Sequence, residues 1–177
     1  GPGFSRAWHP FSVASCRFNP VMRLLIKSVG KDTAHLQDLH AGDEMRIHGP
    51  FVEFHVRHEQ DQVWIAGGVG VAPFLGMVRC LDFRGSGEIR LIQYEGAEEP
   101  ALESELREFQ ARHPQFRSQT IVTSKADFHE LGGLLANLNN PVFLVCGPPS
   151  FMRAVRKSLV KLGIQSSHIH TEEFSPW

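Results

Sequence analysis

Residues 63–75 have the sequence Val-Trp-Ile-Ala-Gly-Gly-Val-Gly-Val-Ala-Pro-Phe-Leu, in which a wholly apolar run ends in three glycines. The apolar run predicts a buried strand, and Pro73 fits the first turn of a following helix, where a missing N–H costs nothing. Such a turn lets the backbone approach a bulky anion, and the helix start offers free N–H groups. The stretch predicts a phosphate or dinucleotide cradle. A tight turn without a ligand is the alternative, because the third glycine of the usual fingerprint is missing.

The composition is that of a globular protein. The chain has 177 residues, 42% of them hydrophobic and 21% charged, enough for one ordinary domain or two small ones. A formal net charge of −1 without a block of Lys and Arg does not indicate a nucleic-acid or anionic-membrane surface. No apolar run approaches the roughly 20 residues that span a bilayer, and no signal peptide is visible. These features predict a cytoplasmic protein or the cytoplasmic domain of a membrane protein.

The cysteines and histidines do not indicate a metal site. Cys16, Cys80 and Cys146 lie far apart without a Cys-x-x-Cys pair, so they predict neither a zinc site nor a cysteine-ligated iron–sulfur cluster. An odd number of isolated thiols fits a reducing compartment. His168 and His170 alternate on an expected strand but have no carboxylate or thiolate partners, which favours a solvated strand edge.

The first third of the chain is expected to be β-rich. Strand-like runs cover residues 11–18, 21–29 and 44–48, and Asp32 is expected to cap a short helix between the last two. Met22, Leu24 and Ile26 alternate with other residues, which predicts one cleanly apolar face. Because three strands and a short helix bury little by themselves, this segment is interpreted as part of a small barrel, or as leaning on the next domain.

From about residue 58, strands alternate with helices. Strands are predicted at residues 63–66, 89–94, 119–123, 141–145 and 169–174, with helices after Pro73, over 99–112, over 131–138 and from Pro149 to Gly163. This order predicts an α/β fold with a doubly wound parallel five-stranded sheet and helices on both faces. Since ligands bind such sheets at the switch point, the turns at residues 67–73 and 146–149 are expected to meet over one ligand.

Three motifs follow one another along the chain. His9-Pro10-Phe11-Ser12 is similar to the flavin motif Arg-x-Tyr/Phe-Ser/Thr, residues 67–74 to a Gly-Gly-x-Gly-x-Thr-Pro turn, and Cys146-Gly147-Pro148 with Met152 and Glu172-Glu173-Phe174 to a Cys-Gly-Pro motif and a closing Glu-x-Phe. Together they resemble the ferredoxin–NADP reductase family, and within it the ferric reductase and NADPH oxidase dehydrogenase branch, for which His-Pro-Phe is typical. Ala72 replaces the family's usual Thr, and Val52 a customary glycine.

The resemblance implies two domains. Residues 1–57 would be the C-terminal half of an antiparallel FAD-binding β-barrel, and residues 58–177 an NAD(P)-binding domain. Because the family's flavin barrel has six strands and only the last three are recognised here, the chain is interpreted as a segment of a longer parent.

The resemblance also implies roles for individual residues. On the flavin side, the expected contacts are made by His9, Pro10, Phe11, Ser12, Lys27, Gly30 and Thr33. On the nicotinamide side, they are made by Gly67, Gly68, Gly70, Pro73, Cys146, Gly147, Pro148 and Met152. Four residues are expected at the reacting rings: Ser12 near flavin N5, Cys146 near nicotinamide C4, and Glu172 with Phe174 shielding the flavin.

The implied function is that of an NAD(P)H-dependent FAD oxidoreductase, which passes hydride to FAD and then single electrons to haem or ferric iron outside this chain. The acceptor would be a membrane haem domain of the same parent or a ferric chelate. A non-catalytic nucleotide-binding or electron-transfer subunit module and a soluble flavin or haem-globin-coupled reductase are the alternatives. Glu95, Glu98 and Glu99 favour NADH, whereas Ser124-Lys125 favours NADPH, and NADH is preferred.

Overall fold

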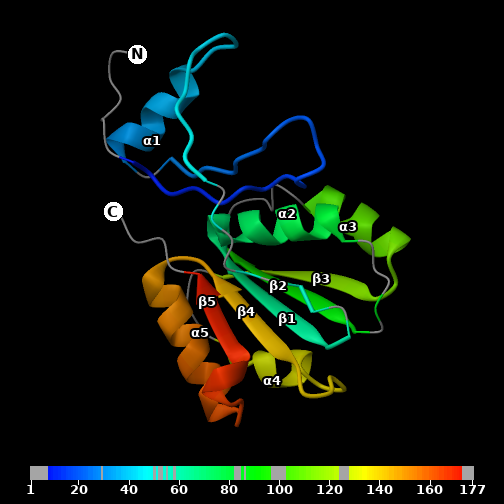
Figure 1. Ribbon diagram of the computed structural model, residues 1–177. Coiled ribbons are helices and arrows are strands. Elements are labelled where there is room, and N and C mark those ends of the chain that lie inside the picture. Colours follow the sequence, from blue (N-terminus) through cyan, green and yellow to red (C-terminus); the bar gives the residue numbers. More distant parts are fainter. Residues whose placement is uncertain are drawn as a thin grey trace.

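The centre of the molecule is a five-stranded parallel sheet, seen in the computed structural model (Figure 1). The strand order is β3-β2-β1-β4-β5. The strands are β1 Gln62–Gly67, β2 Ile89–Glu95, β3 Phe116–Val122, β4 Val142–Cys146 and β5 Ile169–Glu172. The structure describes residues 8–28, 30–49, 51, 54, 56–57, 59–81, 85, 87–96, 103–123 and 128–172. The predicted doubly wound parallel sheet is confirmed.

Helices cover both faces of the sheet. α2 Ala72–Cys80 and α3 Glu103–Arg112 lie on one face, and α4 Leu131–Leu134 and α5 Pro149–Lys161 on the other (Figure 1). Trp64 of β1 packs on the α2 side with Phe74, whereas Val63 packs on the α5 side with Val155 and Leu159. Because successive strand residues point to opposite faces and both faces are covered, β1 is apolar after Gln62, from Val63 to Gly67. No helix within the described residues has both the length and the apolar character needed to cross a bilayer.

The elements differ from the predicted ranges mainly at their ends. β3 begins at Phe116, three residues before the predicted start, and Phe116 is buried against Trp64. α4 ends at Leu134 instead of continuing to residue 138, because Asn137 adopts a left-handed conformation with φ 69° that no helix continues through. Residues 99–102 of the predicted second helix and 173–174 of the predicted last strand lie outside the described residues.

The predicted strands of the first third are not formed as regular strands in the described part of this segment. Their pairing is limited to one antiparallel bridge, Val13 with Leu24, beside which the Ala14 N–H donates to the Arg23 carbonyl at 2.8 Å. A strand without a paired neighbour gains no ladder of hydrogen bonds. The regular elements in the described part of this segment are α1 Lys31–His35 and the short 3₁₀ helix η1 Leu36–Asp38.

The expected apolar face of this segment is observed only in part, because Leu24 and Ile26 are half-buried but Met22 is not. Met22 is exposed, and it is Leu25, from the opposite face of the predicted strand, that packs against the core. Side chains alternate between two faces as expected. Which face is buried depends on the surface that the segment lies against, and here that surface is the core cluster that includes residues of α2.

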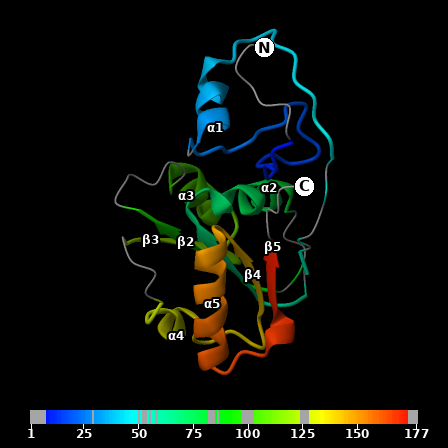
Figure 2. The ribbon, with the colours of Figure 1, turned by 90° about the vertical axis from the view of Figure 1, so that its left-hand side faces the viewer.

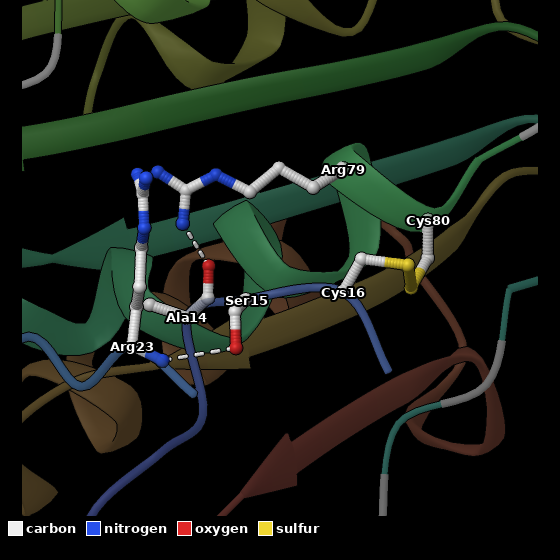
Figure 3. Close-up of a disulfide and its surroundings, with 6 residues drawn as sticks. All are labelled: Ala14, Ser15, Cys16, Arg23, Arg79 and Cys80. Atoms are coloured by element: carbon white, nitrogen blue, oxygen red, sulfur yellow. Dashed lines mark hydrogen bonds between the residues drawn. A yellow bond between two sulfur atoms is a disulfide. The ribbon is translucent and has the colours of Figure 1, made fainter. Parts of the chain in front are cut away.

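The N-terminal segment lies on the α2 side of the sheet (Figure 1, Figure 2). A Cβ on Gly76 of α2 would come within 2.6 Å of the Val13 carbonyl oxygen, so backbone meets backbone here. A few residues further along each segment, Cys16 and Cys80 form a disulfide with 4.9 Å between their Cα atoms (Figure 3). The expectation of three isolated thiols is therefore wrong, and its support for a reducing compartment is lost. The sequence could not show the pair, because 64 residues separate the two cysteines.

Candidate functional site

The turns that follow β1 and β4 lie side by side. β1 and β4 are neighbours in the sheet with Ala66 opposite Cys146, so the two strands end at the same edge of the sheet. A Cβ on Gly70 would come within 2.4 Å of the Cys146 carbonyl oxygen, and one on Gly147 within 3.2 Å of the Gly67 Cα. The predicted convergence of the two turns is confirmed, and it falls at the switch point between β1 and β4.

The glycines of the two turns have different physical reasons. Gly67 and Gly147 leave room for the ring of Phe151, which a Cβ at either position would approach to 2.8 Å. Gly70 leaves room for the backbone at Cys146. Gly68 differs from these three, because it has φ +54° and no atom of the described residues lies within 4 Å of the place of its Cβ. Among these four glycines, Gly68 is the one whose Cβ position meets no other described atom.

Two helices begin at this edge. Pro73 lies in the first turn of α2, as predicted, and Pro148 is the N-cap of α5, with Pro149 in the first turn. η2 Gly68–Val71 runs directly into α2, and the Ala72 N–H is bonded to the Val69 carbonyl. The backbone N–H groups without a helical partner, and the positive end of the dipole, therefore lie at the start of η2 and at the start of α5. The edge is thus suited to the negatively charged phosphates of a dinucleotide.

Cys146 and Glu172 are opposite each other on the neighbouring strands β4 and β5. Burial raises the pKa of the Cys146 thiol to about 12, and the Glu172 carboxylate adds to this, while the Gly147 N–H acts in the opposite direction. The side chain of Cys146 is completely buried, so the thiol is neutral at ordinary pH and can only donate or accept weak hydrogen bonds. The structure brings these two predicted residues together. Phe174, the third of the group, lies outside the described residues.

The segment expected to contact flavin lies next to the start of α1. His9 Nε2 is 3.5 Å from an Asp32 carboxylate oxygen, which joins the His-Pro-Phe-Ser motif to the first turn of that helix. The N-cap is Gly30 instead of the predicted Asp32. The Thr33 hydroxyl accepts from the Gly30 N–H at 3.0 Å and donates to the Gly30 carbonyl at 3.1 Å, which leaves the Asp32 side chain to contact His9. Lys27 is exposed.

Ser12 carries a buried hydroxyl without a hydrogen-bond partner in the described part of the chain. Phe11 is half-buried, with its ring 6.5 Å from that of His9. A buried polar group without a partner costs free energy, so it is normally satisfied by a ligand or a water molecule. A hydroxyl donor next to an aromatic ring fits the polar edge and the flat face of a flavin.

Two other residues differ in importance from the expectation. Met152 is buried among Val155 and Leu159, so its observed contacts are those of a core residue. Phe151 was not among the predicted site residues, yet its ring lies against both glycine turns and packs edge-on against Tyr94 with 5.7 Å between ring centroids. Its place two residues after Pro149, in the first turn of the helix, was the available signal.

The acidic residues expected at the ribose end are described only in part. Glu95 is the last residue of β2, and one of its carboxylate oxygens accepts from the Gln93 amide at 2.5 Å. Glu98, Glu99, Ser124 and Lys125 lie outside the described residues. Within those residues, no group of three or more His, Cys, Asp or Glu side chains gathers as a metal site would require.

The sheet order and the two converging turns are those of a ferredoxin–NADP reductase-like domain, and the chain contains such a domain. No protein-family model matches the chain. It is 31% identical to a flavohemoprotein of Chromobacterium violaceum over 157 residues, which cover 78% of this chain and 38% of that protein.

A second relative is the ferredoxin–NAD(P)(+) reductase component of the naphthalene 1,2-dioxygenase/salicylate 5-hydroxylase systems of a Ralstonia species. The identity is 29%, over 94% of this chain and 56% of that protein. The crystal structure of the Amycolatopsis cytochrome P450 reductase GcoB superposes with a TM-score of 0.82 at 26% identity, covering 99% of this chain and 58% of that one. The chain thus spans about half the length of these proteins.

Proposed function

We propose that this chain is the FAD- and NAD(P)H-binding part of an oxidoreductase that passes hydride from NAD(P)H to FAD and then single electrons to an acceptor outside the chain. The observation that carries the proposal is the meeting of the turns after β1 and β4, where Gly68 opens onto free space beside Cys146. The relatives are a flavohemoprotein and reductases, which supports the same class of reaction. The division into a flavin-binding part, residues 1–57, and a nicotinamide-binding part, residues 58–177, belongs to this proposal.

On the nicotinamide side, the chain binds and orients the dinucleotide. The N–H groups at the starts of η2 and α5 bind its phosphates, with Gly67, Gly68 and Gly70 shaping the turn and Pro73 and Pro148 limiting the helix starts. The neutral thiol of Cys146 lies under this edge, where it offers a small polarizable surface without a charge. The buried side chains of Ala66 and Cys146 keep water out of the sheet beneath this edge.

On the flavin side, the chain supplies a flat face and a donor. Flavin, when bound, accepts a hydride and releases electrons singly, which is chemistry that no side chain offers. Phe11 and Pro10 present an apolar surface, and the Ser12 hydroxyl is available as a hydrogen-bond donor. His9, Lys27, Gly30 and Thr33 are the proposed pyrophosphate contacts, while Glu172 and Phe174 are proposed to cover the flavin. Met152 supports the site from the core.

We propose NADH as the preferred donor. The carboxylate of Glu95 lies at the end of β2, the strand next to β1, where such sheets recognise the ribose 2′ position. A carboxylate accepts from a 2′-hydroxyl and repels a 2′-phosphate. Replacing Glu95 by Gln is expected to weaken NADH binding and to raise the ratio of the NADH dissociation constant to the NADPH dissociation constant toward one.

The acceptor is proposed to be haem or ferric iron. The form His-Pro-Phe-Ser supports the ferric reductase and NADPH oxidase dehydrogenase branch, and the flavohemoprotein relative supports a haem acceptor. A membrane haem domain of the same parent and a cytoplasmic location stay predictions.

Anaerobic mixing with FAD and NADH tests the proposed function. The absorbance of oxidised flavin should fall faster with the protein than with free FAD and NADH alone. If both nucleotides bind but the flavin stays oxidised, the chain is the non-catalytic nucleotide-binding module instead. If neither nucleotide binds, the proposal is wrong in both parts.

A further inference from the structure

The residues that follow the Phe11–Ser12 pair run directly over α2. Val13 lies so close to Gly76 that a Cβ there would come within 2.6 Å of the Val13 carbonyl oxygen. Ala14 is buried in the same core as Phe74 of α2. The segment of residues 13–16 is therefore seated on the helix by backbone packing, and no large side chain separates the two.

Arg79, the residue before the last one of α2, bonds to this segment. Its Nη1 donates to the Ala14 carbonyl (Figure 3). Its Nε and Nη2 donate to the two carboxylate oxygens of Glu105 in α3, each at 2.6 Å. One guanidinium thus joins three parts of the chain that are far apart in sequence. A bidentate pair fixes the plane of the guanidinium, which is why Arg serves here better than Lys.

The surroundings make this contact tighter than an ordinary surface ion pair. The side chain of Arg79 is 11% exposed and that of Glu105 31%, whereas Arg112 and Glu108, on the same helix α3, are 64% and 71% exposed and 3.3 Å apart. The hydrogen bond from Arg79 lowers the pKa of the Glu105 carboxyl, against the effect of burial, and the charges of Arg79 and Arg23 add to it. Exposed ion pairs contribute little to the free energy of unfolding, but a bidentate ion pair at a partly buried position keeps a fixed geometry.

The helix carries this contact to the nucleotide edge. α2 begins directly after η2 Gly68–Val71, so its first turn shapes the proposed nicotinamide site and its last turn carries Arg79 and Cys80. Because an α-helix is rigid over nine residues, the position of Arg79 relative to the glycine turn is fixed. Whatever holds residues 13–16 to Arg79 also sets where Phe11 and Ser12 lie relative to Gly68.

We propose that Arg79, held by Glu105, is a positioning residue that fixes the Phe11–Ser12 segment relative to the nicotinamide turn. The inference rests on the proposed function, since it concerns the alignment of two bound rings. Hydride transfer is sensitive to alignment, and a misplacement of about 1 Å costs on the order of a hundredfold in rate. The Cys16–Cys80 disulfide ties the same segment at its other end, so Arg79 controls the part nearest to Ser12.

Arg79→Gln tests the proposal, with Arg112→Gln as the matched control on an exposed pair. We expect Arg79→Gln to slow flavin reduction at saturating NADH by about ten- to a hundredfold. The NADH dissociation constant should stay within about twofold, because the nucleotide edge itself is unchanged. Arg79→Lys, which keeps the charge but not the bidentate geometry, should recover part of the rate. Arg112→Gln should leave both quantities unchanged.

Hydrogen exchange provides a readout that needs no activity. The Ala14 N–H is bonded to the Arg23 carbonyl, so its exchange reports how firmly residues 13–16 are held. We expect faster exchange at Ala14 in Arg79→Gln and unchanged exchange in β1.

Three outcomes would overturn the proposal. They are a wild-type rate in folded Arg79→Gln, a rate that falls only with the folded fraction, and unchanged exchange at Ala14. If Arg79→Gln does not fold, Glu105→Gln replaces it, and a smaller effect in the same direction is required. If the wild-type chain does not reduce flavin, the proposed function fails, and the exchange at Ala14 alone decides whether Arg79 holds the segment.

Discussion

The carbonyl oxygen of Cys146 lies against Gly70, so close that a Cβ on Gly70 would come within 2.4 Å of it. This contact joins the turn after β1 to the end of β4, two segments that are adjacent only because the strands pair. Gly68, two residues away, has a left-handed φ of +54°, and in the described part of the chain no atom lies within 4 Å of the place of its Cβ. Two glycines of one motif are thus required for different reasons.

Substitutions at these two positions should therefore have opposite profiles. Gly70→Ala forces backbone atoms apart and should lower the free energy of unfolding by about 1–3 kcal/mol. Gly68→Asn should change it by less than about 1 kcal/mol, because Asn tolerates the left-handed conformation. It should nevertheless weaken NADH binding about tenfold or more by filling the open space. Denaturant unfolding and NADH titration measure the two quantities.

Gly163→Asn is the control for Gly68→Asn. Gly163 has φ +87° and open space around its Cβ position, but it lies at the end of α5, away from the turns. It should keep wild-type NADH binding. Wild-type binding in Gly68→Asn would show that the open space at Gly68 does not hold the nucleotide.

Ser12 and Ser15 offer a second matched pair. The Ser12 hydroxyl is buried and has no partner among the described residues, so Ser12→Ala should leave the ligand-free protein as stable as before, or more stable by about 1 kcal/mol. Ser15 Oγ accepts from the Arg23 N–H at 3.0 Å, so Ser15→Ala should lower the free energy of unfolding by about 1 kcal/mol. With FAD bound, Ser12→Ala should slow flavin reduction. Equal losses of stability in the two ligand-free variants would contradict this assignment.

Cys146 should make the stability depend on pH in the alkaline range. Its pKa in the folded protein is raised to about 12 from 9.0, so the unfolded chain loses its proton first as the pH rises. The contribution of the protonated thiol to the free energy of unfolding is fully present below about pH 9 and is lost between about pH 9 and about pH 12. The free energy of unfolding of the wild type relative to Cys146→Ala should therefore fall by about 1.4 kcal/mol per pH unit above about pH 9.

Glu172→Gln is the companion variant for this titration. The Glu172 carboxylate is the second cause of the raised pKa, after burial, so its removal should lower the pKa of Cys146 and narrow the pH range of the effect. A difference between wild type and Cys146→Ala that does not change with pH would contradict the burial of this thiol.

The Cys16–Cys80 disulfide predicts a simple thiol count. The unfolded protein should react with one equivalent of a thiol reagent before reduction and three after it, because Cys146 is the free cysteine. A cross-link over 64 residues restricts the unfolded chain, so replacing both cysteines by Ser should lower the free energy of unfolding by about 4 kcal/mol. Three reactive thiols without reductant would contradict the bond.

Much of the nucleotide-binding half follows from the sequence by itself. The apolar run of β1, Pro73 at the start of α2 and the Cys-Gly-Pro turn after β4 are local signals, each carried by neighbouring residues. Alternation of strands and helices then determines the parallel sheet, since right-handed crossovers leave few other arrangements. The meeting of the two turns was predictable for the same reason.

The tertiary structure alone decided the rest. The Cys16–Cys80 bond, the contact of Arg79 with Ala14 and the ring of Phe151 on Gly67 and Gly147 join residues far apart along the chain, which no local pattern reports. Residues 11–18 have a strand-like sequence, yet a strand forms only where a partner offers a ladder of hydrogen bonds, and α2 offers residues 13–16 a packing surface instead. Sequence thus determined the elements that local propensity and burial specify, whereas long-range packing decided which side chains meet.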